Sequence, residues 1–417
     1  MRILKLTSQL EKRLLARRAQ SDDEAHCVAS EIVSDVRKRG DAALLAWTKK
    51  LDHAGFGVKD LWISQKEIHS AKRNVSSDFL RAIRQAARNI RRVAEKQLPR
   101  SWSLEVQPGV RISQRVVPIE SGGCYIPGGD SSLVSTLLMT AVPAQVAGVP
   151  RIIAVCPKPN NELLAAANFL GIRELARIGG AQAIAALAYG TRSIPRVEKI
   201  FGPGNKYVTE AKQLVSADCA IDLPAGPTEA VVLAERGNAR WIAADILAQA
   251  EHAPDAASFL VTTSSAFAQR VSEEISAQFR AFSPNNHAHR SIRAAGAILL
   301  APSLAAACNF VNRFAPEHLS LPSNANGLLR HIRSAGTIFL GPWGAQPLGD
   351  YISGSNHVLP TAGWARRRGG LSAADFVKCI SVQTISRNGF ARLADGAETL
   401  AATESLEAHR NAVRIRR

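Results

Sequence analysis

Residues 151–215 decide the fold class, and they read RIIAVCPKPNNELLAAANFLGIRELARIGGAQAIAALAYGTRSIPRVEKIFGPGNKYVTEAKQLV. Within this stretch a short apolar run of strand length repeatedly leads through a turn into an amphipathic helical stretch. A short buried strand followed by a crossover helix is the repeating unit of a parallel sheet. The stretch therefore predicts an α/β domain.

The same pattern returns after Gly226, where EAVVLAE, WIAADILAQAEH, SFLVTT and AFAQRVSEEISAQF follow one another. We therefore expect an α/β protein with two doubly wound, incomplete Rossmann-like domains. The expected boundaries are a helical N-terminal segment at 1–20, a first α/β domain formed by 21–124 plus 230–371, a second α/β domain at 125–229, and a helical C-terminal tail at 372–417.

Local signals place further elements around this framework. Residues 21–23 can cap a helix that runs to about Gly40, and Ser64–Glu67 fits a capping box. From Ser77 onward, apolar residues recur at helical spacing until Pro99. Residues 110–119 alternate as a strand should, whereas the tail after about Leu371 lacks strand alternation and is predicted to be helical.

Composition restricts the class of protein. A hydrophobic content of 46% with 21% charged residues is typical of a globular chain. No apolar run reaches the roughly 18–20 residues of a membrane helix, and the charged N-terminus does not resemble a signal peptide. The six cysteines form no CxxC pair, which argues against a disulfide framework and a thiolate zinc site. We expect a reduced, cytoplasmic protein that binds no membrane.

The net charge of +17 leaves two interpretations. Clustered Lys and Arg side chains can bind nucleic-acid phosphates. Here the arginines are spread over many segments, and no recognisable nucleic-acid-binding module accompanies them. A solvated basic surface that attracts anionic ligands is the favoured interpretation, and we expect no nucleic-acid partner.

Three glycine-containing turns are candidates for holding a nucleotide. They lie at Tyr125–Gly129, Gly179–Gln182 and Gly202–Asn205. Small residues after a strand let backbone N–H groups and a helix N-terminus approach a phosphate. None of the turns matches the full G-x-G-x-x-G motif, and glycine is also common at strand–helix junctions for purely structural reasons.

Polar residues near the histidines suggest a metal site and an acid–base pair. Imidazole nitrogen and carboxylate or amide oxygen are ligands that zinc accepts. Gln249, His252, Asp350 and His409 could supply them, although lone histidines are more often hydrogen-bonded structural groups. Adjacent Glu317 and His318 are expected in a loop between apolar stretches, and they could exchange protons with a substrate and activate water.

Taken together, these segments resemble the histidinol dehydrogenase family. The matching stretches are GCYIPGG, GGAQAIAALA, KIFGPGNKYVTEAK, AIDLPAGPTE, DILAQAEH, APEHLSL, GDYISGSNHVLPT and ESLEAHRNAV. They occur in the family's order from about Gly123 to Val413, and thus cover at least two-thirds of the chain. The sequence departs from the family pattern at Thr228, where many relatives carry Ser, at Asp130 after the Gly-Gly turn, and in its strong positive charge.

The resemblance implies a role for each candidate residue. The implied zinc ligands are Gln249, His252, Asp350 and His409. The implied catalytic pair is Glu317 and His318. The implied NAD contacts are Tyr125, Gln182 and Asn205. The implied substrate contacts are Thr228, His357 and Glu404, together with the catalytic pair and the metal ligands. The first α/β domain would then carry the catalytic and most metal residues, and the second would bind NAD.

The resemblance also implies the reaction and the assembly. L-histidinol would be oxidised to L-histidinal and then to L-histidine with two NAD⁺, with one Zn²⁺ per site orienting the substrate. His318 would act as general base, and Glu317 would activate water. The family implies a homodimer whose exchanged tails carry Glu404 and His409 into the partner's site. Two alternatives remain: a relative that oxidises another polar alcohol, and a basic nucleic-acid-binding protein built on a degenerate dehydrogenase.

Overall fold

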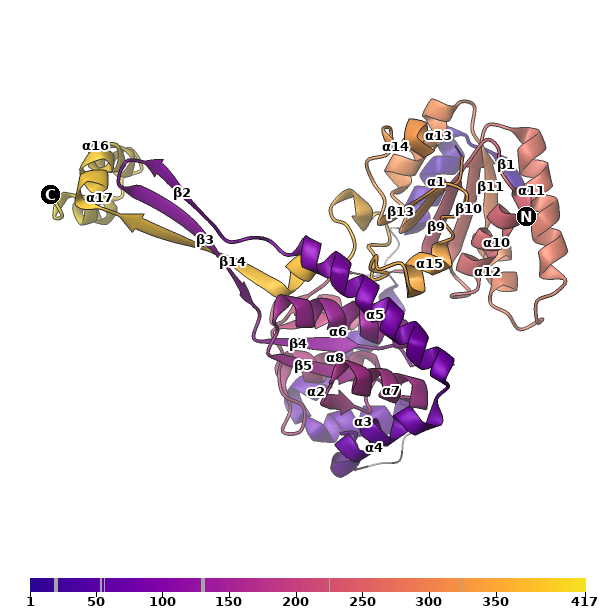
Figure 1. The fold of residues 1–417 in the computed structure, drawn as a ribbon, viewed down its shortest axis with the longest axis horizontal. Helices are drawn as coiled ribbons and strands as arrows, with labels where there is room; N and C mark the ends of the chain where they lie inside the picture. The colour runs from indigo at the N-terminus through magenta and orange to yellow at the C-terminus, as the bar shows by residue number, and fades with distance from the viewer. Residues whose placement is uncertain (19–21, 53–54, 56, 129–131, 225, 324) are drawn as a thin grey trace.

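The computed structural model describes residues 1–417 except 19–21, 53–54, 56, 129–131, 225 and 324. The described strands form a five-stranded sheet, a six-stranded sheet and a three-stranded sheet. Figure 1 shows two α/β bodies side by side and a long arm that extends away from them, with the C-terminus at its tip. The prediction of an α/β protein with two parallel-sheet domains is confirmed.

The five-stranded sheet is parallel and contains the stretch that decides the fold class. Its strands, in spatial order, are β6 (Glu174–Ala176), β5 (Arg151–Val155), β4 (Ser121–Tyr125), β7 (Lys199–Phe201) and β8 (Ala220–Ile221). Its crossover helices are α6 (Val134–Ala147), α7 (Asn161–Leu170), α8 (Gly180–Tyr189) and α9 (Lys206–Val215). Asn160 and Asn205 cap α7 and α9 through their side-chain oxygens, so local sequence sets where these helices begin.

The capping signals near residues 22 and 64 correctly predict the starts of two of the N-terminal helices. The helices of residues 23–97 are α2 (Asp23–Arg39), α3 (Asp41–Asp52), α4 (Gln65–Ala71) and α5 (Ser77–Gln97), with short 3₁₀ turns at Val58–Asp60 and Lys72–Asn74. Asp22 accepts a hydrogen bond from the N–H of Ala25, and Ser64 accepts one from the N–H of Glu67. Ser21, also considered as a cap, lies outside the described residues.

The six-stranded sheet forms the second body and is also parallel. Its spatial order is β1 (Arg2–Lys5), β11 (Ala297–Leu300), β10 (Ala257–Thr262), β9 (Glu229–Leu233), β12 (His318–Leu321) and β13 (Thr337–Leu340). The accompanying helices are α1 (Ser8–Arg18), α10 (Ala239–Ala250), α11 (Ser265–Phe279), α12 (Ala288–Ala294), α13 (Leu304–Phe314), α14 (Ala325–Leu329) and α15 (Gln346–Tyr351), followed by 3₁₀ turns at Trp364–Arg366 and Ala373–Phe376.

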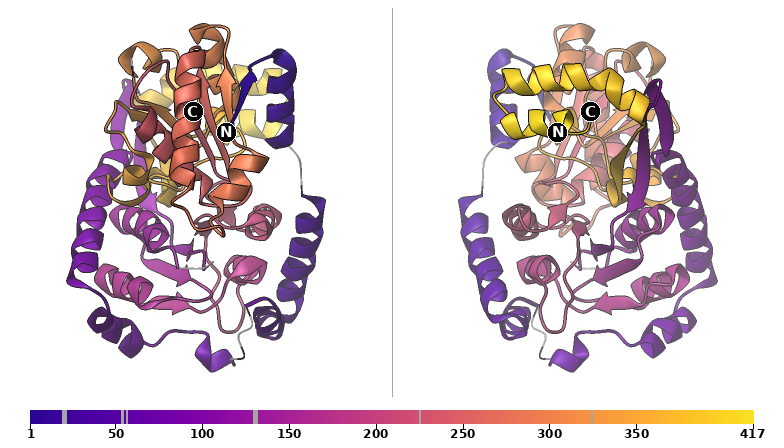
Figure 2. Two further views of the ribbon diagram at one scale, coloured as in Figure 1. Left: turned by 90° about the vertical axis from the view of Figure 1, so that its right-hand side faces the viewer. Right: turned by 90° about the vertical axis from the view of Figure 1, so that its left-hand side faces the viewer.

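The bodies divide the chain differently from the expected boundaries. Residues 1–20 include a strand, because β1 pairs in parallel with β11 at the edge of the six-stranded sheet. The expected boundaries place residues 21–124 in one domain with residues 230–371. In the structure, the helices of residues 23–97 instead pack in the cores around the five-stranded sheet. Figure 2 shows α1 against one body and α2 against the other. The physical reason is long-range packing of apolar helix faces. That of α2 packs against α8 and α9, and that of α5 packs against α6.

The arm corrects the prediction for the C-terminal tail. Its antiparallel sheet consists of β2 (Trp102–Gln107), β3 (Val110–Pro118) and β14 (Val377–Ile385), and its tip carries α16 (Arg387–Thr403) and α17 (Glu407–Arg414). After the 3₁₀ turn at Ala373–Phe376, the tail therefore continues as a strand and only then becomes helical. β14 forms because its backbone pairs with β3 along its full length, from Val377 opposite Pro118 to Ile385 opposite Val110.

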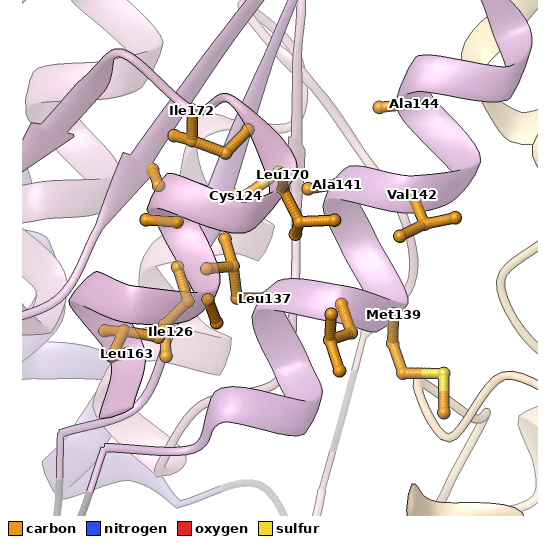
Figure 3. Packing of buried hydrophobic residues seen from close by; sticks show 14 of the residues in the cluster. Cys124, Ile126, Leu137, Met139, Ala141, Val142, Ala144, Leu163, Leu170 and Ile172 are labelled. Atoms are coloured by element: carbon orange, nitrogen blue, oxygen red, sulfur yellow. The ribbon is translucent and has the colours of Figure 1, made fainter. Parts of the chain in front are cut away.

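The core of the body that contains the five-stranded sheet surrounds α6, whose residues 136–144 are all buried. Figure 3 shows Leu137 and Ala141 of this helix on the side of Leu170 of α7, whereas Met139 points away from α7. A helix that is apolar on every side needs cover on every side, and α5 and α7 supply it. In the described part of the chain, no helix combines the length and apolar character needed to cross a bilayer.

Candidate active site

His318 lies at the start of a strand and not in the expected loop. It begins β12, which lies between β9 and β13 in the six-stranded sheet. Its side chain is buried, and its ring stacks on Phe339 with centroids 6.0 Å apart. One ring nitrogen, Nε2, lies 3.3 Å from Oδ1 of Asp350, and the other, Nδ1, lies 3.7 Å from Oε2 of Glu317. The imidazole is therefore held between two buried carboxylates.

These contacts set the proton affinity of the pair. Burial lowers the pKa of His318, but the carboxylates of Glu317 and Asp350 outweigh burial, so the pKa is raised above its ordinary value. Burial raises the pKa of Asp350, yet the contact with His318 outweighs it and leaves the pKa lowered. An imidazole with this surrounding can accept a proton and hold it, which is what a general base requires.

A short hydrogen-bond chain fixes Glu317. The Thr228 hydroxyl donates to its Oε2 at 2.5 Å, and the backbone N–H of Glu229 donates to the same oxygen at 3.0 Å. The Gln249 amide in turn donates to the Thr228 hydroxyl. The hydroxyl of Thr228 thus orients the carboxylate of Glu317.

Three of the four candidate metal ligands lie in this body. Gln249 is on α10, His252 follows the end of that helix, and Asp350 is on α15, which packs against α10. The Oε1 atom of Gln249 is buried and has no hydrogen-bond partner in the structure, and His252 interacts electrostatically with Asp350. An unpartnered buried oxygen costs free energy unless a ligand satisfies it.

His409 lies apart from these three residues in the same chain. It belongs to α17, at the far end of the arm in Figure 1, and its side chain is exposed. Glu404, directly after α16, is also exposed on the arm. Accordingly, the described residues of one chain contain no group of three or more His, Cys, Asp or Glu side chains arranged to hold a metal.

His357 is partly buried near the same residues. Burial lowers its pKa to about 4, with smaller contributions from the charges of Asp350, His318 and His252. Its Nε2 atom is buried and has no hydrogen-bond partner in the structure. The ring is therefore neutral near pH 7 and presents a nitrogen that a polar ligand could satisfy.

The three candidate NAD contacts converge on the other body. Tyr125, Gln182 and Asn205 line one pocket of about 580 Å³, beyond the carboxyl ends of β4 and β7 and at the start of α8 and α9. The Tyr125 hydroxyl accepts a hydrogen bond from the N–H of Gly180 at 3.1 Å. Crevices at the carboxyl ends of parallel strands are where α/β folds bind nucleotides.

Sequence reasoning missed two charged residues of this pocket, Asp52 and Lys158. Asp52 ends α3, in a segment without a nucleotide-binding pattern, so no local signal could have found it. Two residues considered earlier, Gly129 and Asp130, lie outside the described residues, and the departure at Asp130 stays untested.

Comparisons with known proteins identify the family of this chain. The profile of the histidinol dehydrogenase family matches residues 15–417. The histidinol dehydrogenases of Methanosarcina mazei and Escherichia coli are each 42% identical over 98% of this chain, and the match covers 96% and 95% of their lengths. That of Aquifex aeolicus is 43% identical over 99% of this chain and 97% of its own length. The chain belongs to the histidinol dehydrogenase family.

A solved structure supports the same assignment. Histidinol dehydrogenase from Elizabethkingia anophelis is similar with a TM-score of 0.94 and 36% identity, covering 100% of this chain and 98% of that one. The chain is therefore an oxidoreductase of the histidinol dehydrogenase type, and the resemblance inferred from its motifs is confirmed.

Proposed function

We propose that the chain oxidises L-histidinol to L-histidinal and then to L-histidine, reducing two NAD⁺, as a last step of histidine biosynthesis. One observation carries the proposal: His318 is buried between Glu317 and Asp350 in a chain of this family. The first oxidation removes a hydride and the hydroxyl proton. The second needs water to add to the aldehyde before another hydride leaves, so the site needs both a base and a group that activates water.

His318 takes the hydroxyl proton as the hydride leaves, because the adjacent carboxylates favour its protonated form. Glu317 activates the water that hydrates the aldehyde. Its Oε2 accepts bonds from Thr228 and the Glu229 N–H, which hold the carboxylate in one orientation. His318 then serves again as base in the second oxidation.

Zn²⁺ fits the donor set of this site. Gln249, His252 and Asp350 offer amide oxygen, imidazole nitrogen and carboxylate oxygen, and the Gln249 Oε1 atom is buried without a partner. These residues would hold one zinc per site, together with His409 from a second copy of the chain. When bound, the metal supplies a Lewis-acid position for the amine and imidazole of the substrate.

The substrate would contact residues on both sides of this position. His357 presents a neutral, partly buried ring, and Thr228 lies next to Glu317. The full proposed set is Thr228, Gln249, His252, Glu317, His318, Asp350 and His357, with Glu404 and His409 from a second copy.

The NAD⁺ site is proposed at the pocket that Tyr125, Gln182 and Asn205 line. Gln182 is fully buried and its Oε1 atom has no hydrogen-bond partner in the structure, which suits an additional polar ligand. Asn205 caps α9, so its N-terminal N–H groups lie beside the pocket and favour an anionic group.

A homodimer is proposed because the arm leaves apolar side chains exposed. They include Trp102, Leu104 and Val106 on β2, Ile380 and Val382 on β14, and Leu400, Leu406 and Ile415 at the tip. Large apolar surface on a projecting element is typical of an interface. Seated on a second copy, the arm would carry Glu404 and His409 to that copy's site. All six cysteines are free, which suits a reduced cytoplasmic enzyme.

The test is NADH formation from L-histidinol, measured with the protein as purified, after chelation, and after zinc is restored. We expect activity to fall on chelation and return with zinc. Efficient oxidation of other polar alcohols, with none of L-histidinol, would favour the alternative dehydrogenase. Salt-dependent DNA binding without NADH formation would favour the basic binding protein.

A further inference from the structure

The proposed cofactor pocket contains a carboxylate. Among the described residues that line the pocket, Asp52 is the only acidic one, and Lys158 is the only lysine or arginine. Asp52 is the last residue of α3 and is partly buried, so its side chain is accessible to a ligand in the pocket. It lies beside Tyr125 and Gln182 although 73 and 130 residues separate it from them along the chain.

Asp52 is hydrogen-bonded to another residue that lines the pocket. Its Oδ2 atom accepts a hydrogen bond from Nε2 of Gln182 at 3.3 Å. Burial is the main cause of the raised pKa of Tyr125, and the charge of Asp52 raises it further. The carboxylate therefore acts on two of the three side chains proposed to contact the cofactor. The carbonyl end of α3 adds partial negative charge at the same place.

The two nicotinamide cofactors differ at one position that a carboxylate can distinguish. NAD⁺ has a hydroxyl group at the 2′ position of the adenosine ribose, whereas NADP⁺ has a phosphate there. A carboxylate accepts hydrogen bonds from ribose hydroxyl groups and repels a phosphate. The chain's net charge of +17 would by itself attract the more highly charged cofactor, so discrimination requires a local negative group.

We propose that Asp52 accepts hydrogen bonds from the adenosine ribose hydroxyl groups of NAD⁺ and excludes the 2′-phosphate of NADP⁺. This inference rests on the proposed function, because it assumes that the pocket of Tyr125, Gln182 and Asn205 holds the dinucleotide. Asp52 thereby determines which of the two dinucleotides the enzyme uses.

The test measures binding without catalysis. The full chain is titrated calorimetrically with ADP-ribose and with 2′-phospho-ADP-ribose, and then the Asp52→Asn variant is titrated with both. We expect ADP-ribose to bind the unaltered chain more tightly. In Asp52→Asn the ratio of the two dissociation constants should shift toward the phosphorylated ligand by roughly 10- to 100-fold, the scale of one charge-assisted hydrogen bond. Steady-state KM values for NAD⁺ and NADP⁺ should shift in the same direction.

The matched control is Glu31→Gln, which removes an exposed carboxylate from α2 of the same body without altering the pocket lining. It should leave the ratio unchanged. Asp52→Ser provides a second variant if Asp52→Asn does not fold, as judged by circular dichroism and thermal unfolding.

Two results overturn the inference while leaving the proposed function intact. The first is that neither dissociation constant changes in a folded variant of a chain that uses NAD⁺. The second is an equal loss for both ligands, which would mean that Asp52 only holds Gln182. If neither ligand binds the unaltered chain and neither dinucleotide supports L-histidinol oxidation, both the cofactor assignment and this inference fail.

Discussion

At the scale of single residues, His318 lies between the carboxylates of Glu317 and Asp350, which favour its protonated form. Replacing it in His318→Asn should lower turnover by roughly 10²- to 10⁴-fold, the usual effect of losing a positioned general base. Zinc content should hardly change, because His318 is outside the proposed ligand set. The control is His69→Asn, which alters an exposed histidine on α4 of the other body. Turnover within a few-fold of the unaltered chain would remove His318 from the mechanism.

Glu317 is expected to act on water and not on the alcohol. Glu317→Gln should therefore slow the complete conversion to L-histidine more than the first hydride transfer from L-histidinol. Single-turnover NADH formation from L-histidinol, compared with steady-state formation of L-histidine, separates the two effects. If both slow equally, Glu317 also takes part in the first oxidation. The Thr228→Ala variant, which removes a hydrogen bond to Glu317, should show a weaker form of the same pattern.

The metal assignment depends on His252, which follows the end of α10 and is exposed in the single chain. His252→Ala should lose zinc and most activity, because removing one of four ligands leaves the ion under-coordinated. Metal content by atomic emission and NADH formation from L-histidinol measure the two effects. Full zinc occupancy at unaltered turnover would disprove the ligand set. His331→Ala, an exposed histidine distant in sequence from the proposed ligands, serves as control.

At the scale of elements, a buried ion pair supports the turn that leads into α9. Lys212 on that helix binds Asp222 and donates to the carbonyl of Gly202 at 2.9 Å, while the Gly202 N–H donates to Asp222 at 2.7 Å. Both charged side chains are almost fully buried. They hold Gly202 in a left-handed conformation three residues before Asn205. A Cβ atom on Gly202 would collide with the carbonyl of Tyr125.

We expect Lys212→Met to reduce the free energy of unfolding by about 3–5 kcal/mol, since it leaves Asp222 charged and buried without its partner. It should also raise KM for NAD⁺, because the turn before Asn205 loses its support. Urea unfolding and steady-state kinetics measure these changes. The double variant Lys212→Met/Asp222→Leu should lose less stability than the sum of its single variants. An additive loss would mean that the two charges do not stabilise each other.

The strand β14 shows where element prediction fails. Residues 377–385 contain several β-branched side chains but no clear alternation of apolar and polar positions, and most of them are exposed in the single chain. Alternation arises when one face of a sheet is buried and the other solvated. A strand in a projecting arm lacks that difference within its own chain. By contrast, capping residues correctly predicted α2 and α4, and helical periodicity correctly predicted α5.

At the scale of the whole molecule, the arm separates His409 from the other proposed zinc ligands (Figure 1). Each site should therefore be completed by a second copy, which a mixture of two inactive variants can test. A mixed dimer of His318→Ala and His409→Ala has one site with both changes and one with neither, so activity should return. With random pairing the recovery should reach about one quarter of the unaltered activity.

The matched control mixes His318→Ala with His252→Ala, whose changes both lie in the body of the chain. Every site of that mixed dimer contains one change, so no activity should return. Native mass spectrometry verifies that mixed dimers form in each case. If they form and the first pair stays inactive, the tail serves its own chain and the proposed exchange is wrong.

The sequence by itself determined the local structure and the kinds of chemistry. Capping residues, helical periodicity and short apolar runs act between neighbours along the chain, so they specified α2, α5 and the repeats of both α/β bodies. The adjacent pair Glu317 and His318 was recognisable for the same reason. The resemblance in eight motifs then indicated the family, which the comparisons confirmed.

Only the tertiary structure decided which distant segments meet. Strand pairing depends on which edges are free once other strands have paired, and nothing within β1 or β14 specifies β11 or β3 as its partner. Long-range packing likewise brings Asp52 to Gln182, a contact that no local pattern encodes. The pairing of β14 with β3 also places α17 at the tip of the arm. The described residues of one chain therefore do not bring together all four proposed zinc ligands.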